Sequence, residues 1–145
     1  MRPKFREIVV VTIGDAGSAN VLALLFPTLT ERYDVFVIAD ASGAGKGVLE
    51  KAGIPFAIWA GGPVDLAGVS LVLASTSGKA QGLWKAVSSA AQANRVRLLW
   101  FGDFFGSGCE KPLADFEPDY LTVLDEGTAE QYRASRGGMT QTIIN

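Results

Sequence analysis

The chain has 145 residues, a formal net charge of −2 and 48% hydrophobic residues, which suits one domain with a single buried core. Its 17 glycines and 19% charged residues are typical of an α/β domain and argue against disorder. The scattered basic residues exclude an electrostatic footprint for DNA or RNA. Cys109 stands alone and histidine is absent, so the sequence offers no intrachain disulfide, metal site or Ser-His relay.

The N-terminal residues combine basic side chains with a short apolar run that ends in Gly14 and Asp15. This pattern predicts a first strand, not a signal peptide. The longest apolar stretch, "VLALLFPTL", is far shorter than the roughly 20 residues that span a bilayer, and it contains Pro27. We therefore expect no membrane span and a cytoplasmic protein.

Short β-branched runs alternate with helical patterns along the whole sequence, which predicts parallel strands joined by crossover helices. The fold class expected is a doubly wound, Rossmann-like α/β sandwich of three layers, with a mainly parallel sheet of about six strands. It forms a single domain over residues 1–145. The expected strands cover 7–13, 34–39, 55–59, 69–74, 96–101 and 120–124, and the expected helices cover 18–32, 45–53, 78–94 and 128–136.

Local signals refine these limits. Pro27 should kink the first helix, because proline lacks the amide hydrogen that the helix needs. Thr128 and Gln131 have the spacing of a capping box for the last helix, and Gly137 is placed to end it. The connection over 102–118 is longer than usual and carries Phe104 and Phe105, which we expect at a surface for a second copy or a partner domain.

The stretch "IADASGAGKG", residues 38–47, resembles a phosphate-binding loop but departs from the Walker pattern at two positions. Asp40 replaces the first glycine and would set a carboxylate beside phosphate oxygens, and Val48 replaces the hydroxyl that binds magnesium. The sequence therefore favours a turn shaped by Gly43, Gly45 and Gly47, with Lys46 coincidental and no nucleotide cofactor.

A dinucleotide site is a second interpretation, since Asp40 ends the second expected strand, where an acid can accept hydrogen bonds from a ribose. The first turn, "GDAGSAN", has Gly14 and Gly17 three residues apart and lacks the complete glycine fingerprint. A nucleotide- or dinucleotide-binding protein remains an alternative, as does a non-enzymatic interaction module.

Four segments resemble the N-terminal half of GT-B-fold sugar enzymes, a superfamily with nucleotide-sugar glycosyltransferases and UDP-N-acetylglucosamine 2-epimerases. They are "GDAGSANVLALLFPTL", "ADASGAGKGVLEKAGIPF", "LAGVSLVLASTSG" and "EPDYLTVLDEGTAEQY". The resemblance implies an acceptor-side or sugar-binding half that does not turn over alone, with "GGMTQTIIN" as the start of a linker. It also implies a sugar or nucleotide-sugar ligand, and a homo-oligomer or a separate C-terminal partner.

Ligands of open α/β sheets bind beyond the carboxyl ends of the strands, which directs attention to the turns after each strand. Asp15 is a candidate general base or a helix cap, and "STSG" is a candidate anion or sugar site or another cap. Asp125 and Glu126 fit capping or a solvated edge better than an acid/base pair. Trp59, Trp84 and Trp100 are expected in the core or at its margin, with a sugar-stacking platform as the alternative. The other candidate ligand-binding residues are Gly14, Gly17, Ser18, Ser42, Gly43, Ser75, Thr76, Ser77, Gly78 and Asp103.

Overall fold

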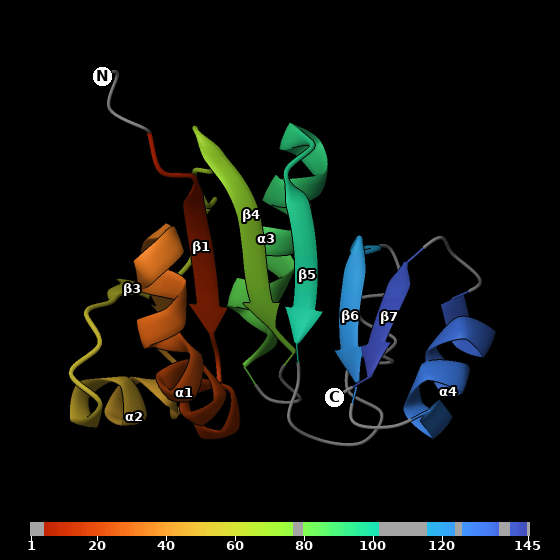
Figure 1. Ribbon diagram of the computed structural model, residues 1–145, viewed down its shortest axis with the longest axis horizontal. Coiled ribbons are helices and arrows are strands. Elements are labelled where there is room, and N and C mark those ends of the chain that lie inside the picture. The colour runs from red at the N-terminus through yellow and green to blue at the C-terminus, as the bar shows by residue number, and fades with distance from the viewer. Residues whose placement is uncertain (1–4, 77–79, 102–115, 124–125, 137–139, 145) are drawn as a thin grey trace.

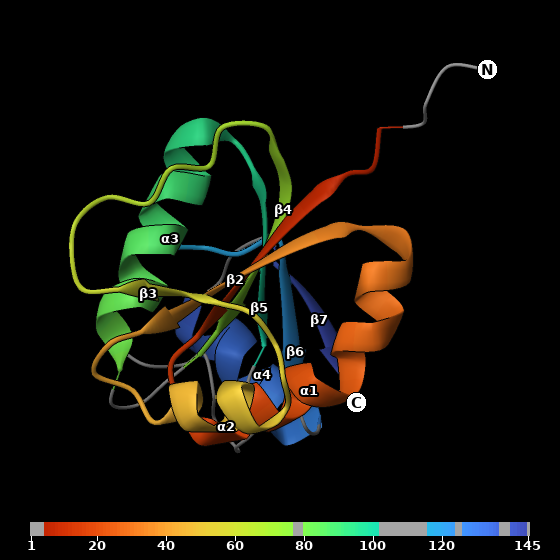
Figure 2. The same ribbon diagram turned by 90° about the vertical axis from the view of Figure 1, so that its left-hand side faces the viewer.

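The computed structural model describes residues 5–76, 80–101, 116–123, 126–136 and 140–144. These residues form one parallel sheet of seven strands in the order β3-β2-β1-β4-β5-β6-β7, flanked by helices on both faces (Figures 1 and 2). The strands are β1 (Ile8–Ile13), β2 (Asp34–Asp40), β3 (Ala57–Trp59), β4 (Val69–Ser75), β5 (Arg97–Phe101), β6 (Tyr120–Val123) and β7 (Gln141–Ile144). The helices are α1 (Ala16–Arg32), α2 (Gly45–Lys51), α3 (Gln81–Asn94) and α4 (Glu126–Arg136). The predicted fold class is confirmed.

The seventh strand is the main departure from the sequence-based expectation. Gln141–Ile144 pair in parallel with Tyr120–Val123, although these residues were expected to begin a linker. A four-residue strand gives too short an alternation for its pattern to stand out from a loop. In this structure the segment completes the sheet.

The helix signals have different outcomes. Helix α4 begins at Glu126, so Thr128 lies within the helix and the predicted capping box is wrong. Helix α1 runs through Pro27 to Arg32, so this proline lies inside the helix, and the kink expected there stays a prediction. Gly137, the expected stop after α4, lies outside the described residues.

The core has two parts, one on each face of the sheet. Because strand side chains alternate between faces, Val9 and Val11 pack with α1 and α2, while Val10 packs with α3 and α4. In the second part Trp84 and Trp100 meet edge to face, with ring centroids 5.0 Å apart at 79°. Both indoles are at most 1% exposed, which confirms that these two tryptophans belong to the core.

The helices change faces between β1 and β4, which are neighbours in the sheet. Helix α1 follows β1 and packs on one face, and α3 follows β4 and packs on the other, as Figure 2 shows. Such a reversal is a topological switch point, where the loops after the two strands diverge and leave room for a ligand. The carboxyl ends of β1 and β4 are therefore where a ligand is expected in this fold.

Arg95 follows the last residue of α3 in the left-handed conformation, with φ 54° and ψ 38°. Its side chain is exposed, and a residue with a Cβ atom is strained at these angles. We expect Arg95→Gly to raise the free energy of unfolding by about 0.5 to 1 kcal/mol. Urea unfolding measures this, with Gln92→Gly inside α3 as a control that should be destabilised. A loss of stability in Arg95→Gly would contradict the assignment of strain.

Among the helices that the structure describes, none is long and apolar enough to cross a membrane.

Candidate functional site at the carboxyl ends of the strands

The carboxyl ends of β1, β4 and β5 are tied together by hydrogen bonds between buried groups. The backbone amide of Gly14 donates to Ser75 Oγ at 3.1 Å, which joins the end of β1 to the end of β4. The amide and hydroxyl of Thr76 both donate to the carbonyl oxygen of Phe101, at 2.8 and 3.2 Å. Gly14, Ser75 and Thr76 are all buried. Gly14, Ser75 and Thr76, three of the candidate ligand-binding residues, therefore hold these strand ends together at the switch point.

The glycine-rich turn after β2 packs directly against the turn after β1. A Cβ atom on Gly43 would lie 1.8 Å from the carbonyl oxygen of Gly14, and the Gly45 amide donates to that same oxygen at 3.3 Å. A Cβ atom on Gly45 would lie 2.5 Å from Ile13 Cγ2. Gly43 and Gly45 therefore allow two backbones to touch, whereas Gly47 lies inside α2 with open space around it.

Lys46 does not reach out from this turn. Its ammonium donates to the carbonyl oxygen of Ala41 at 2.7 Å, within the same loop. Helix α2 begins at Gly45, so the amides of the turn serve the junction between β1 and β2. These contacts favour the structural interpretation of "ASGAGKG" over a phosphate cradle.

Asp40 joins the β2 turn to the first turn of α3. Its Oδ1 accepts from the amide and the hydroxyl of Ser42, at 2.9 and 2.7 Å, and its Oδ2 accepts from the amide of Leu83 at 3.2 Å. The side chain is only 4% exposed. Both carboxylate oxygens are engaged, so Asp40 is poorly placed to receive the hydroxyls of a ribose.

Asp15 caps α1. Its Oδ1 accepts from the amide of Ser18 at 2.9 Å, and its backbone is extended as in an ordinary helix cap. The carboxylate is half-buried, and Gly17 lies beside it in the first turn of the helix. Ser18 is fully buried, and its hydroxyl has no hydrogen-bond partner within the described part of the chain. The capping role predicted as one of two roles for Asp15 is confirmed, and a general-base role stays a prediction.

The start of α3 decides whether the "STSG" segment caps this helix. The helix starts at Gln81 after Ala80, so Thr76 does not cap it, and the predicted cap at Thr76 is wrong. Glu126 lies in α4 and pairs with Arg133 at 3.1 Å, as expected of a solvated helix end. Several other candidates lie outside the described residues, namely Ser77, Gly78, Asp103, Phe104, Phe105, Cys109 and Asp125.

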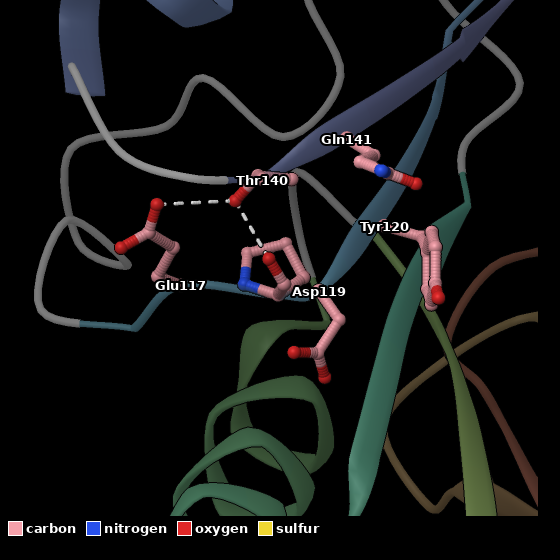
Figure 3. Close-up of a pocket in the computed structure, with 6 residues that line it drawn as sticks. Glu117, Asp119, Tyr120, Thr140 and Gln141 are labelled. Carbon is pink, nitrogen blue, oxygen red and sulfur yellow. Dashed lines mark hydrogen bonds between the residues drawn. The ribbon is translucent and has the colours of Figure 1, made fainter.

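The described cavities lie away from this edge. One of about 320 Å³ is at the amino ends of β6 and β7, where Figure 3 shows Glu117 turned toward Thr140. The Thr140 hydroxyl lies 3.3 Å from Glu117 Oε1 and 2.6 Å from the Pro118 carbonyl oxygen. Asp119 accepts from the Leu98 amide at 2.9 Å. Glu117, Thr140 and Asp119 thus each make a hydrogen bond within the protein at this cavity.

A larger groove of about 740 Å³ lies over β1, β2 and β3 on the face that carries α3, and its lining includes Phe36 and Pro55. It lies along the strands and not at their carboxyl ends. We therefore keep the switch point as the candidate site, on the grounds of topology and not of cavity size. Within the described ranges, no cluster of three or more histidine, cysteine or acidic side chains could hold a metal ion.

Solved structures share this fold, and the two described here belong to proteins about twice as long as the part matched. The first is a Listeria monocytogenes protein assigned as a UDP-N-acetylglucosamine 2-epimerase, with a TM-score of 0.64 and 14% identity. The second is Anabaena HepE (Alr3699), whose structure holds UDP and glucose, with a TM-score of 0.62 and 17% identity. Each match covers 97% of this chain, and 44% or 45% of the other protein.

No family model matches the sequence, and no curated protein matches it significantly. The structural matches confirm the fold resemblance inferred from the sequence: the chain has the fold of a little under half of each of these two proteins. At these identities the likeness concerns the fold alone.

Two residues of the edge were not recognised for what they do. The sequence suggested Asp40 as a hydrogen-bond acceptor for a ribose, whereas in the structure its carboxylate joins the β2 turn to the first turn of α3. Gly82 was not among the candidate residues, yet a Cβ atom there would lie 3.0 Å from the ring of Trp59. A glycine inside a predicted helix was the available signal, because glycine is unfavourable there and its presence suggests close packing.

Proposed function

We propose that the chain is the acceptor-side or sugar-binding half of a GT-B-like glycosyltransferase or sugar epimerase, and that it does not turn over alone. The ligand is a sugar or the sugar part of a nucleotide sugar, bound at the carboxyl ends of β1, β2 and β4. Completion of the reaction then depends on a nucleotide-sugar domain supplied by another polypeptide segment or partner.

The observation that carries the proposal is the position of the switch point. The turns containing Gly14, Gly43 and Ser75 converge there through direct backbone contacts and buried hydrogen bonds. An edge built in this way is rigid before any ligand arrives, which reduces the entropy cost of binding. The fold match to HepE, whose structure holds UDP and glucose, supports a ligand of this class.

The rival nucleotide functions receive less support from the contacts. Lys46 is engaged by the Ala41 carbonyl oxygen, and both oxygens of Asp40 accept hydrogen bonds from the protein. Binding of ATP or NAD at this edge would require these bonds to be broken. No described contact favours the interaction-module alternative over sugar binding.

The proposal is tested by titrating the ¹⁵N-labelled chain with glucose, UDP and UDP-glucose while following amide shifts. We expect the largest shifts at Gly14, Gly17 and Gly43. Gly17→Val, which adds bulk in the first turn of α1, should weaken sugar binding about tenfold or more, a loss of about 1.4 kcal/mol. Gly47→Ala, at a site with open space, should bind like the wild type.

Absence of binding with all three ligands would overturn the proposal. Micromolar NAD binding that Asp40→Asn abolishes would favour the dinucleotide alternative. Release of UDP from UDP-glucose by the chain alone would contradict the claim that it needs a second domain.

A further inference from the structure

Trp59 differs from the other two tryptophans of the chain. Trp84 and Trp100 are buried at the centre of the core on the α3 face, whereas Trp59 is half-buried. Among the described residues, the two core clusters and the hydrophobic side chains packed against them do not include Trp59. Burial in the core therefore does not explain why a side chain of this size occupies this position.

Trp59 lies at the same edge of the sheet as the candidate site. It is the last residue of β3 and pairs with Asp40, the last residue of β2. The Trp59 carbonyl oxygen accepts from the amide of Ala41 at 2.9 Å, which holds the β2 turn against it. The Trp59 backbone thus lies beside the turn that contains Ser42. A Cβ atom on Gly82 would lie 3.0 Å from the ring and 3.8 Å from Oδ2 of Asp40, the carboxylate that Ser42 contacts.

The indole is held in place from two sides. Its Nε1 donates to the Gly62 carbonyl oxygen at 3.0 Å. A Cβ atom on Gly82 would lie 3.0 and 3.1 Å from ring atoms Cζ3 and Cη2, so the glycine in the first turn of α3 makes room for the ring. The ring therefore spans the space between the loop after β3 and the start of α3. Since it is already ordered, a ligand that contacts it need not immobilise it.

Ser42 supplies a polar group in the turn that is bonded to the end of β3. The side chain is exposed, and its hydroxyl donates to Asp40 Oδ1 at 2.7 Å, which leaves its oxygen free to accept. A sugar ring matches this combination, because the C–H bonds on one of its faces can lie on the indole while a hydroxyl group at its edge donates to Ser42.

We propose that Trp59 is the stacking platform for the apolar face of a sugar ring at this edge, with Ser42 as a hydrogen-bond acceptor for a sugar hydroxyl. The inference rests on the proposed function and adds the residue that holds the sugar. Gly82 serves the platform by letting the indole lie against the first turn of α3.

Titration with glucose, followed by the change in tryptophan fluorescence and by calorimetry, tests the platform. The wild type should show a fluorescence change that disappears in Trp59→Phe, because Trp84 and Trp100 are buried. By calorimetry Trp59→Leu should weaken glucose binding about tenfold, and Trp59→Phe should weaken it less, since a smaller aromatic face remains. Phe36→Leu, which changes an exposed aromatic in the groove over β1, β2 and β3, should bind like the wild type.

Gly82→Ala provides a second variant that keeps the indole. The added methyl group meets the ring at 3.0 Å, so the ring must shift by a few tenths of an ångström, and glucose binding should weaken although the helix gains a better helix former. Circular dichroism verifies that each variant is folded.

The outcomes separate the two proposals. Glucose binding that is unchanged in both Trp59→Leu and Gly82→Ala would overturn the platform and leave the proposed function standing. Absence of sugar binding in the wild type would overturn both. Binding of uridine, but not glucose, in a Trp59-dependent manner would overturn the assignment of a sugar ring to this platform.

Discussion

Replacing Gly43 by alanine is expected to lower the free energy of unfolding by about 3 kcal/mol, the upper range for forcing extra volume into a packed site. The added Cβ atom would lie 1.8 Å from the carbonyl oxygen of Gly14 and 2.8 Å from its carbonyl carbon. Both are backbone atoms, so no side chain can rotate away to relieve the overlap. Either the β2 turn or the β1 turn must move. Urea unfolding followed by circular dichroism measures the change.

Gly47→Ala is the matched control, two glycines further along the same stretch. Gly47 lies within α2, is exposed, and has no atoms within 4 Å of the added Cβ. Alanine should therefore raise the free energy of unfolding by about 0.5 to 1 kcal/mol through its higher helix propensity. If both variants behaved alike, the close approach of the two turns would be refuted.

Asp40→Asn is expected to lower the free energy of unfolding by about 2 kcal/mol, because hydrogen bonds to a buried charged group are stronger than neutral ones. The substitution preserves size but replaces one carboxylate oxygen with an amide donor. Whichever way the amide is turned, its NH₂ faces either the Leu83 amide or the pair of donors on Ser42. One set of hydrogen bonds must be lost. Thermal and urea unfolding both report this loss.

Asp65→Asn is the control for Asp40→Asn. Asp65 is exposed and accepts one local hydrogen bond, from the Ala67 amide at 2.9 Å, so its replacement should change stability by no more than about 0.5 kcal/mol. A wild-type stability for Asp40→Asn would show that Asp40 does not hold the two loops together, and would reopen its role as a ligand contact.

Much of the fold could be predicted because parallel strands buried on both faces leave a strong signal. The run around Val9–Val11 is apolar on both sides, and the helical stripe of α3 places Trp84 and Val87 toward the sheet. The turn residues Gly14, Asp15, Ser42 and Ser75 could be found for the same reason, since they follow predicted strands. The likeness to half of a GT-B-like sugar enzyme came from this order of strands, turns and helices.

The sequence by itself determined the alternation of strands and helices, the core residues, and the edge of the sheet where a site belongs. Each depends on spacing along the chain, which local patterns record. Only the tertiary structure decided which atoms meet across that edge: Gly43 against Gly14, Asp40 with Leu83, and Trp59 beside Gly82. The partners in these contacts are 29, 43 and 23 positions apart, from 43 − 14, 83 − 40 and 82 − 59. These contacts depend on the order of the strands in the sheet and on the face against which each helix packs, and no local sequence pattern carries that information.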